Sequence, residues 1–281
     1  MRFRATRTLR ALLLGTAIGL SGCSTLSLPF ITPDPDPERA QEEYRQGLNY
    51  TQGIGVEQDY AEGVRHFKRA ARFGSSDAAY MTGLAYVTGR GISGDFAEAA
   101  EWLEPAAEAG HDGAALLLGK LYISGLGVDQ DKDWGAYWIG RAAEGGVNQA
   151  MLELAVCYHA GIGLPNDAGM AWLWADRAAD AGIEKATEAS RRLLAKSSPA
   201  ERRQAISRVQ QARAGSHDLA TTTYLQQKLT QLGYKPGTVD GLWGPRTQKA
   251  LSAFRLTESL PQSDTPQLDD LKRLRERAEK H

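Results

Sequence analysis

The chain has 281 residues, with 33 basic and 34 acidic side chains and a formal net charge of −1 at pH 7. A balance this even offers no basic surface for a polyanion, so the composition argues against a nucleic-acid partner. The five histidines do not fall at metal-ligand spacings, and no carboxylate pair stands in a setting that demands acid–base chemistry. We therefore expect no enzyme, no cofactor and no metal site.

Residues 1–22 have the layout of a signal peptide. Four arginines and no acidic residue precede an apolar stretch, Ala11 to Leu20, which is too short to span a bilayer as a mature helix. Leu20-Ser21-Gly22-Cys23 follows and resembles the lipobox of bacterial lipoproteins. The resemblance implies that Cys23 becomes the lipidated first residue. The alternative is an ordinary secreted protein with a chance cysteine at this position.

The lipobox resemblance also bears on location and on charge. Lipoproteins kept in the inner membrane typically carry Asp after the cysteine, whereas this chain has Ser24. The resemblance therefore implies the inner leaflet of the outer membrane, facing the periplasm. Removal of residues 1–22 leaves 29 basic against 34 acidic side chains, a net charge of −5. Cys157, the other cysteine, then has no disulfide partner, and we expect it as a buried free thiol.

Residues 23–38 join the lipidated Cys23 to a proline-rich tether. Prolines at 29, 33, 35 and 37 prevent helix formation and favour an extended chain. At polyproline spacing such a stretch reaches about 40 Å. We expect it to hold the following domain away from the membrane.

Residues 39–186 repeat one unit four times, at an interval of 36 residues and without gaps. The positions that keep the interval are Tyr50/Tyr86/Tyr122/Tyr158, Gly53/Gly89/Gly125/Gly161, Gly55/Gly91/Gly127/Gly163, Asp59/Asp95/Asp131/Asp167 and Gly74/Gly110/Gly146/Gly182.

Each repeated position has a mechanical role in a helical hairpin. A first short helix ends near the Tyr, and the Gly-x-Gly pair supplies the positive φ angles that turn the chain. The Asp caps a second helix, which carries apolar residues at helical spacing and closes at the last Gly. Residues 83–110, GLAYVTGRGISGDFAEAAEWLEPAAEAG, are similar to the SEL1-like repeat, a longer relative of the tetratricopeptide repeat. The resemblance implies an all-α fold with a solenoid of four helical hairpins that binds proteins and has no catalytic residues.

Four apolar residues break the register of the repeats. Trp134 and Met170 occupy a position held by glutamate in the first two repeats, and Tyr137 and Leu173 occupy one held by arginine or glutamate. Because residues 134 and 137 lie one turn apart and repeats stack side by side, these four residues should form one patch. One interpretation is a docking surface for a partner protein. The other is a face covered by the capping helix or the C-terminal domain.

Residues 187–216 repeat nothing and are expected to form a capping helix and linker. Ser198-Pro199-Ala200-Glu201 is a helix start, and Ile206, Val209 and Ala212 mark one apolar side. A solenoid needs a terminal element with a polar outer face, and this segment fits that need.

Residues 217–281 predict a small domain of three helices. Leu225, Leu229 and Leu232 share one helical face, Pro245 can open a second helix, and Thr265-Pro266 can cap a third. From Leu225 to Phe254 the segment resembles the peptidoglycan-binding domain appended to many cell-wall hydrolases. The positions that carry the resemblance are Leu225, Leu229, Leu232-Gly233-Tyr234, Gly237, Asp240-Gly241, Gly244, Thr247, Ala250 and Phe254. The chain departs from that family at Arg255, where Gln is usual, and at Ser259-Leu260, where Gly-Leu is usual, so the contact surface could differ.

The candidate peptidoglycan-contacting residues are Tyr234, Asp240, Trp243 and Arg246. Aromatic faces stack on sugars, and an acid can bond to a hydroxyl or amide. Asp240 and Trp243 also have a structural interpretation, with Asp240 bonding to the backbone of its own turn and Trp243 covering the small core.

Together these features predict an outer-membrane-anchored periplasmic lipoprotein that binds peptidoglycan and presents its repeats to an unidentified envelope protein. Two alternatives stay open. The chain could deliver or regulate a cell-wall hydrolase or synthase, or it could assist assembly of a polysaccharide-export or motility complex.

Overall fold

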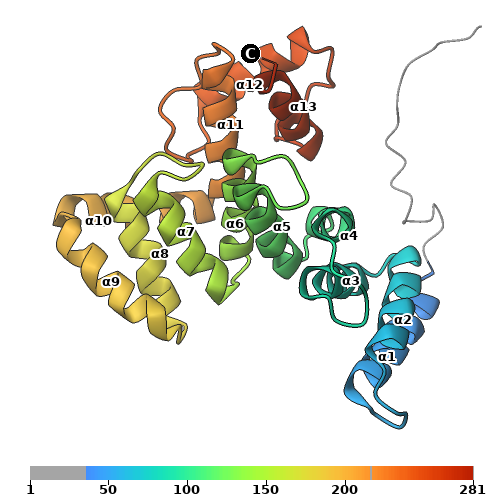
Figure 1. Cartoon of the computed structure of the whole chain (residues 1–281). Helices are drawn as coiled ribbons and strands as arrows, with labels where there is room; N and C mark the ends of the chain where they lie inside the picture. Colours follow the sequence, from blue (N-terminus) through green and yellow to red (C-terminus); the bar gives the residue numbers. More distant parts are fainter. Residues whose placement is uncertain (1–35, 216, 281) are drawn as a thin grey trace, which may run out of the picture.

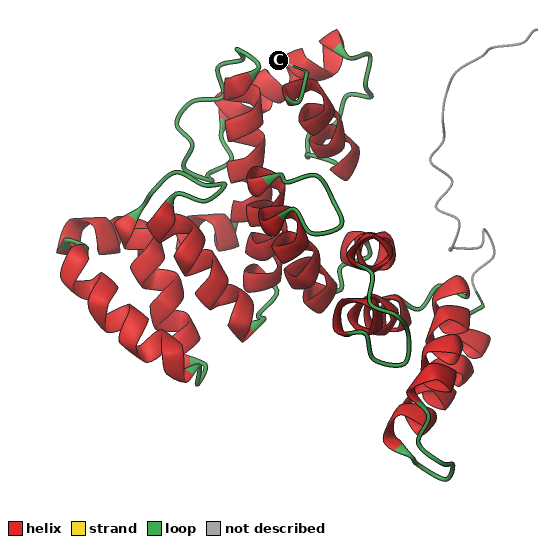
Figure 2. Ribbon diagram, viewed as in Figure 1, coloured by secondary structure: helices red, strands yellow, loops and turns green. Residues whose placement is uncertain are grey.

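The computed structural model describes residues 36–215 and 217–280, and these ranges contain helices and loops without strands (Figure 2). The predicted all-α class is confirmed. The helices, labelled in Figure 1, are α1 (Pro37–Gln52), α2 (Tyr60–Arg72), α3 (Ser76–Thr88), α4 (Phe96–Glu108), α5 (Asp112–Ser124), α6 (Lys132–Glu144), α7 (Asn148–Ala160), α8 (Ala168–Asp180), α9 (Glu184–Lys196), α10 (Pro199–Ala214), α11 (Leu219–Gln231), α12 (Pro245–Thr257) and α13 (Leu268–Ala278). None of these helices is long and apolar enough to cross a membrane. The signal segment and Cys23 lie outside the described residues.

Helices α1 to α8 form the four predicted hairpins, with the predicted caps and turns. In the second repeat Asp95 caps α4, and its side chain accepts the backbone N–H of Ala97 at 2.9 Å. Gly89 and Gly91 have φ angles of 69° and 77°, which glycine adopts without strain. Gly91 serves a second purpose, because a Cβ there would lie 2.4 Å from the carbonyl oxygen of Tyr60 in the preceding repeat. The loop within the second hairpin therefore also packs directly against the first hairpin.

The solenoid runs from α1 and α2 at one end to α9 and α10 at the other (Figure 1). Its core contains the tryptophans of one register, Trp102, Trp138 and Trp174, each no more than 2% exposed. Cys157 lies in the same core as a free thiol, as expected.

Two predicted boundaries shift in the structure. Pro37, assigned to the tether, opens α1, because proline is tolerated in the first turn and Asp36 caps the helix with a 3.0 Å bond from Arg39 N–H. The segment after the repeats contains two helices rather than one. Helix α9 packs on α8 as a further solenoid helix, and α10, begun by the predicted capping box at Ser198, also packs on α8.

The C-terminal domain has the three predicted helices, α11, α12 and α13. Leu225, Leu229 and Leu274 form its core at 0% exposure, and Pro245 opens α12 as predicted. Helix α13 begins at Leu268 with Gln267 as its cap, so the predicted cap at Thr265-Pro266 is wrong. This domain packs through α11 onto α6, in the middle of the solenoid (Figure 1).

Candidate functional site

The loop between α11 and α12 carries three of the four candidate contact residues, Arg246 follows in the first turn of α12, and Asp240 organises the turn of the loop. One carboxylate oxygen of Asp240 accepts the N–H of Leu242 at 2.9 Å, and the other accepts the Thr238 hydroxyl at 3.2 Å. Both oxygens are thus engaged within the chain. The structure agrees with the structural interpretation of Asp240, which shapes the loop that holds Tyr234 and Trp243.

Gln226 on α11 is a second organiser of this loop, and the sequence patterns did not single it out. Its side-chain oxygen accepts the N–H groups of Asp240 at 3.0 Å and Gly241 at 2.8 Å, while its amide donates to Asp240 Oδ1 at 3.1 Å. Gln226 is 2% exposed. A polar residue next to the core residue Leu225 was the one available signal, since buried amides need hydrogen-bond partners.

Tyr234 and Trp243 on this loop, and Arg246 just after it, keep accessible surface. The half-buried Trp243 ring stacks on His217 with centroids 4.4 Å apart, and Tyr234 meets Phe254 edge-on at 5.9 Å. Arg246 is exposed in the first turn of α12. Within the described ranges no hydrogen bond or ring contact joins these three side chains to one another. Tyr234 and Trp243 lie on the same loop but pack against different residues, and Arg246 lies next to the loop on α12.

Arg255 does not alter the contact surface, because it is 1% exposed. Its guanidinium pairs with Asp270 of α13 at 2.6 Å and donates to the Thr265 carbonyl at 2.7 Å, so it fixes the loop between α12 and α13. Ser259 at the start of that loop has a φ of 56°, the left-handed conformation that favours glycine. Both departures from the family pattern therefore act on loop structure.

The four residues that break the repeat register are buried, so the predicted docking surface is wrong. Exposure is 0% for Trp134, 2% for Tyr137, 0% for Met170 and 6% for Leu173. Tyr224 of α11 covers the first pair, with its ring centroid 5.1 Å from Trp134 and 5.4 Å from Tyr137. The structure agrees with the alternative interpretation, in which the chain itself covers these four residues.

Helix α8, which carries the second pair, packs against the capping helix α10. Gly169, the residue before Met170, allows this approach, because a Cβ there would lie 2.4 Å from the Glu201 carbonyl and 3.3 Å from the Ala205 side chain. The two pairs therefore lie on helices with different neighbours, α11 on the third repeat and α10 on the fourth.

Ion pairs surround the aromatic contact between the domains. Arg275 of α13 pairs with Asp131, the cap of α6, at 2.7 Å, and Lys228 of α11 pairs with Asp133 at 2.7 Å. Arg208 of α10 bonds to Asp167 at 2.6 Å and to the Asp240 carbonyl at 2.8 Å. The capping helix therefore also holds the candidate loop.

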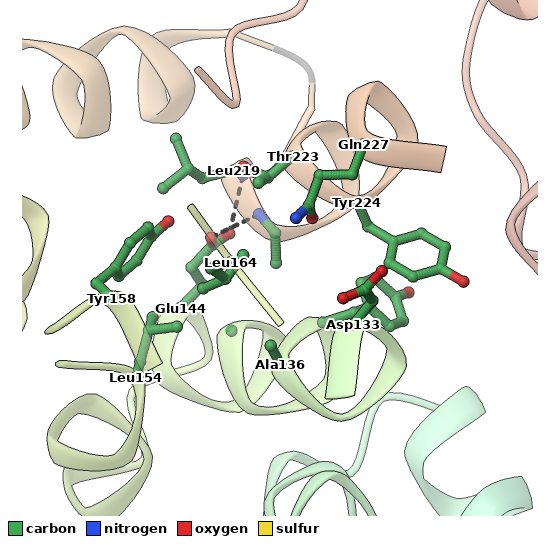
Figure 3. Close-up of a pocket in the computed structure, with 13 residues that line it drawn as sticks. Asp133, Ala136, Glu144, Leu154, Tyr158, Leu164, Leu219, Thr223, Tyr224 and Gln227 are labelled. Carbon is green, nitrogen blue, oxygen red and sulfur yellow. Dashed lines mark hydrogen bonds between the residues drawn. The ribbon is translucent and has the colours of Figure 1, made fainter. Parts of the chain in front are cut away.

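Glu144, at the end of α6, caps α11 from the solenoid. Its carboxylate accepts the N–H groups of Leu219 at 3.2 Å and Ala220 at 2.9 Å (Figure 3). Burial, followed by the nearby Asp218 carboxylate, raises the pKa of Glu144 to about 8. The adjacent cavity, lined by Tyr158 and Thr223, holds about 10 Å³, which is room for one water molecule. Glu144 therefore lies at a joint between the two domains, and the cavity beside it is too small for a ligand.

The described residues contain no group of three or more His, Cys, Asp or Glu side chains placed to hold a metal ion. The fold and the site thus define a helical repeat scaffold with a small loop-bearing domain fixed on its third repeat. Residues 43–74, 76–111, 113–147 and 148–183 match the Sel1 repeat, and residues 220–263 match a putative peptidoglycan binding domain. The chain is a Sel1-repeat protein with a peptidoglycan-binding-type domain, and both are binding modules without catalytic chemistry.

Two solved structures support the repeat fold. A Sel1 repeat protein from Oxalobacter formigenes is 34% identical with a TM-score of 0.50, and the match covers 55% of this chain and 45% of that one. The protein c5321, a protective antigen present in uropathogenic Escherichia coli strains, displays an SLR fold. It is 25% identical with a TM-score of 0.51, over 78% of this chain and 54% of that one. The chain spans about half the length of both proteins. No curated protein matches it.

Proposed function

We propose that this protein is a peptidoglycan-binding scaffold, held by a lipid on Cys23 in the inner leaflet of the outer membrane. The observation that carries the proposal is the loop between α11 and α12. It belongs to a segment that matches a peptidoglycan-binding domain, and it keeps Tyr234 and Trp243 accessible, with Arg246 exposed at the adjacent start of α12, while the domain is packed on the solenoid. Wall binding and repeat packing therefore use different residues of one domain.

The lipid anchor rests on the sequence of residues 1–23. A lipid at one end and a wall contact at the other would reinforce each other, because the first attachment raises the effective concentration for the second. Mass spectrometry of the membrane-extracted protein tests this directly. We expect a lipidated N-terminal peptide starting at Cys23 and release of a Cys23→Ala variant from the membrane fraction.

The wall contact is tested by retention on purified sacculi. Truncation after Gly215 would expose Trp134 and Tyr137, so point variants are the cleaner choice. We expect Trp243→Ala and Arg246→Ala each to lower retention about tenfold, equivalent to about 1.4 kcal/mol. Lys249→Ala, an exposed basic residue on the same helix as Arg246, is the matched control. Equal retention of all four proteins would reject wall binding through this loop.

The repeats are the protein-binding part of the proposal, as their family implies. Ile54 and Leu126 occupy equivalent turns of the first and third repeats, with 56% and 45% of their surface exposed. Photo-crosslinkers at these two positions in living cells should give discrete adducts with an envelope protein. Absence of adducts at both positions, with normal protein level and localisation, would count against a scaffold role for this face.

A further inference from the structure

An apolar groove of about 600 Å³ lies between α1, α2 and α3, at the N-terminal end of the solenoid (Figure 1). Helices α3 and α5 pack against each other, whereas no comparable packing joins α1 to α3 among the described residues. The space between α1 and α3 is therefore open. The apolar residues that line it are Tyr60, Val64 and Phe67 of α2 and Met81, Leu84 and Ala85 of α3.

The polar side chains of this groove make few demands on an occupant. The hydroxyls of Thr51 and Thr88 already donate to carbonyls one turn earlier in their own helices, at 2.9 Å and 2.8 Å. Arg90 is the one charged residue among the described residues that line the groove, and its guanidinium lies 4.3 Å from the centroid of the Tyr60 ring. Apolar walls with few polar groups take apolar ligands, so the occupant should be apolar and largely uncharged.

The segment that precedes α1 in the sequence has this composition. Residues 24–33, STLSLPFITP, contain no charged side chain, and Leu26, Leu28 and Phe30 stand at every second position. Pro29 and Pro33 disfavour a helix here, and residues two apart in an extended chain lie on one face. The three apolar side chains therefore share a face if the segment is extended.

The length of this segment matches the distance to the groove. Helix α1 carries the chain about 21 Å from Pro37 to Thr51, at about 1.5 Å per residue. An extended segment that runs back along α1 covers about 22 Å from Pro37 to Phe30, at about 3.1 Å per residue. Phe30 therefore reaches the level of Thr51, in the groove, and Leu28 reaches about 6 Å further.

We propose that the chain's own N-terminal segment occupies this groove, antiparallel to α1, with Leu28 and Phe30 inserted between α1 and α3. Docking changes the distance between the membrane and the repeats, a consequence that rests on the proposed lipid anchor at Cys23. The docked segment leaves residues 23–30, about 20 Å, between the lipid and the groove, whereas the released tether reaches about 40 Å. The groove therefore sets how far the first repeat stands from the membrane.

Disulfide formation between introduced cysteines tests this placement in the full lipidated chain. Phe30→Cys with Thr88→Cys should form a disulfide within one chain, because the bond requires Cβ atoms about 4 Å apart. Phe30→Cys with Ser124→Cys is the matched control, since Ser124 holds the position of Thr88 one repeat later, is also exposed and bonds to its own helix at 2.7 Å. We expect crosslinking about tenfold faster with Thr88→Cys. The native Cys157 is buried and does not compete.

A charge on the inserted face of the segment gives a second measurement. Leu28→Asp places a carboxylate in the apolar groove and should slow the crosslink between positions 30 and 88 about tenfold. Ser27→Asp adds the same charge on the opposite face and should leave the rate unchanged. Mass spectrometry of the same samples shows whether Cys23 carries its lipid.

Several outcomes would overturn the placement. Equal crosslinking rates for Thr88→Cys and Ser124→Cys would do so, as would equal rates in Leu28→Asp and Ser27→Asp. A crosslink that joins two chains would assign the groove to the N-terminal segment of a second copy and reject docking within one chain. Slow crosslinking with lipid on Cys23 defeats the docking alone. Absence of the lipid defeats the proposed anchor, while the crosslinking rates still decide the docking.

Discussion

Replacing Tyr224 with alanine should loosen the joint between the solenoid and the C-terminal domain. The side chain is 1% exposed and packs against Trp134 and Tyr137. A buried aromatic side chain removes roughly 150–200 Å² from water, or about 4–5 kcal/mol at 25 cal/mol per Å². The Tyr224 hydroxyl is buried without a hydrogen-bond partner among the described residues, which offsets about 1–2 kcal/mol of that gain. We therefore expect a net loss of about 3 kcal/mol.

The same reasoning predicts the opposite effect for Tyr224→Phe. This change keeps the ring and removes the unpartnered hydroxyl, so it should leave stability unchanged or raise it by about 1 kcal/mol. The pair of variants thus separates ring packing from the polar group on one side chain.

Urea unfolding followed by tryptophan fluorescence measures both effects, and hydrogen exchange locates them. Amides of α6 and α11 should exchange faster in Tyr224→Ala, because these helices lose their shared contact. Phe96→Ala is the control, since its ring is 38% exposed and it belongs to α4, which contributes no ring to this aromatic cluster. Equal losses in Tyr224→Ala and Phe96→Ala, with unchanged exchange in α6, would refute the assignment of this cluster as the joint.

Three further changes test other parts of the structure. Protonated Glu144 stabilises the fold most below its ordinary pKa of 4.5, and this contribution is lost as pH rises to about 8. Glu144→Gln should therefore flatten the pH dependence of the unfolding free energy between pH 5 and 8, measured in urea. Asp270→Ala leaves the buried Arg255 unpaired and should cost about 3–5 kcal/mol in the same assay. Ser259→Gly should raise the thermal midpoint, with a gain of about 0.5–1 kcal/mol, because residue 259 has a φ of 56°.

The repeats could be predicted from the sequence because every element of a hairpin has a local cause. Asp95 caps its own helix, and Gly89 turns its own loop. The residue type at each of these positions therefore predicts the local structure, whatever the hairpin packs against. Four copies in register then make neighbouring hairpins equivalent. This is why the order of the helices was predicted correctly.

The contacts between distant segments could not be predicted in the same way. The sequence indicates that Trp134 and Tyr137 leave the charged pattern, but both a partner and an internal cover satisfy that signal. Tyr224 lies 90 or so residues further along the chain, and no periodicity connects it to the third repeat. Arg255 is similar, because its burial depends on Asp270 in another helix.

The register break explains why the C-terminal domain lies where it does. At the position of Trp134, the first two repeats carry half-buried glutamates, Glu62 and Glu98, which need water or a cation. Among the described repeats the third has stacked rings there, with Trp134 and Tyr137 4.7 Å apart, and α11 packs on α6 of that repeat. The apolar replacements therefore select one site along a periodic scaffold. In the proposed function, this fixed placement means that a load on the wall-binding loop passes through α11 to the third repeat, so the wall contact and the repeats act as one body.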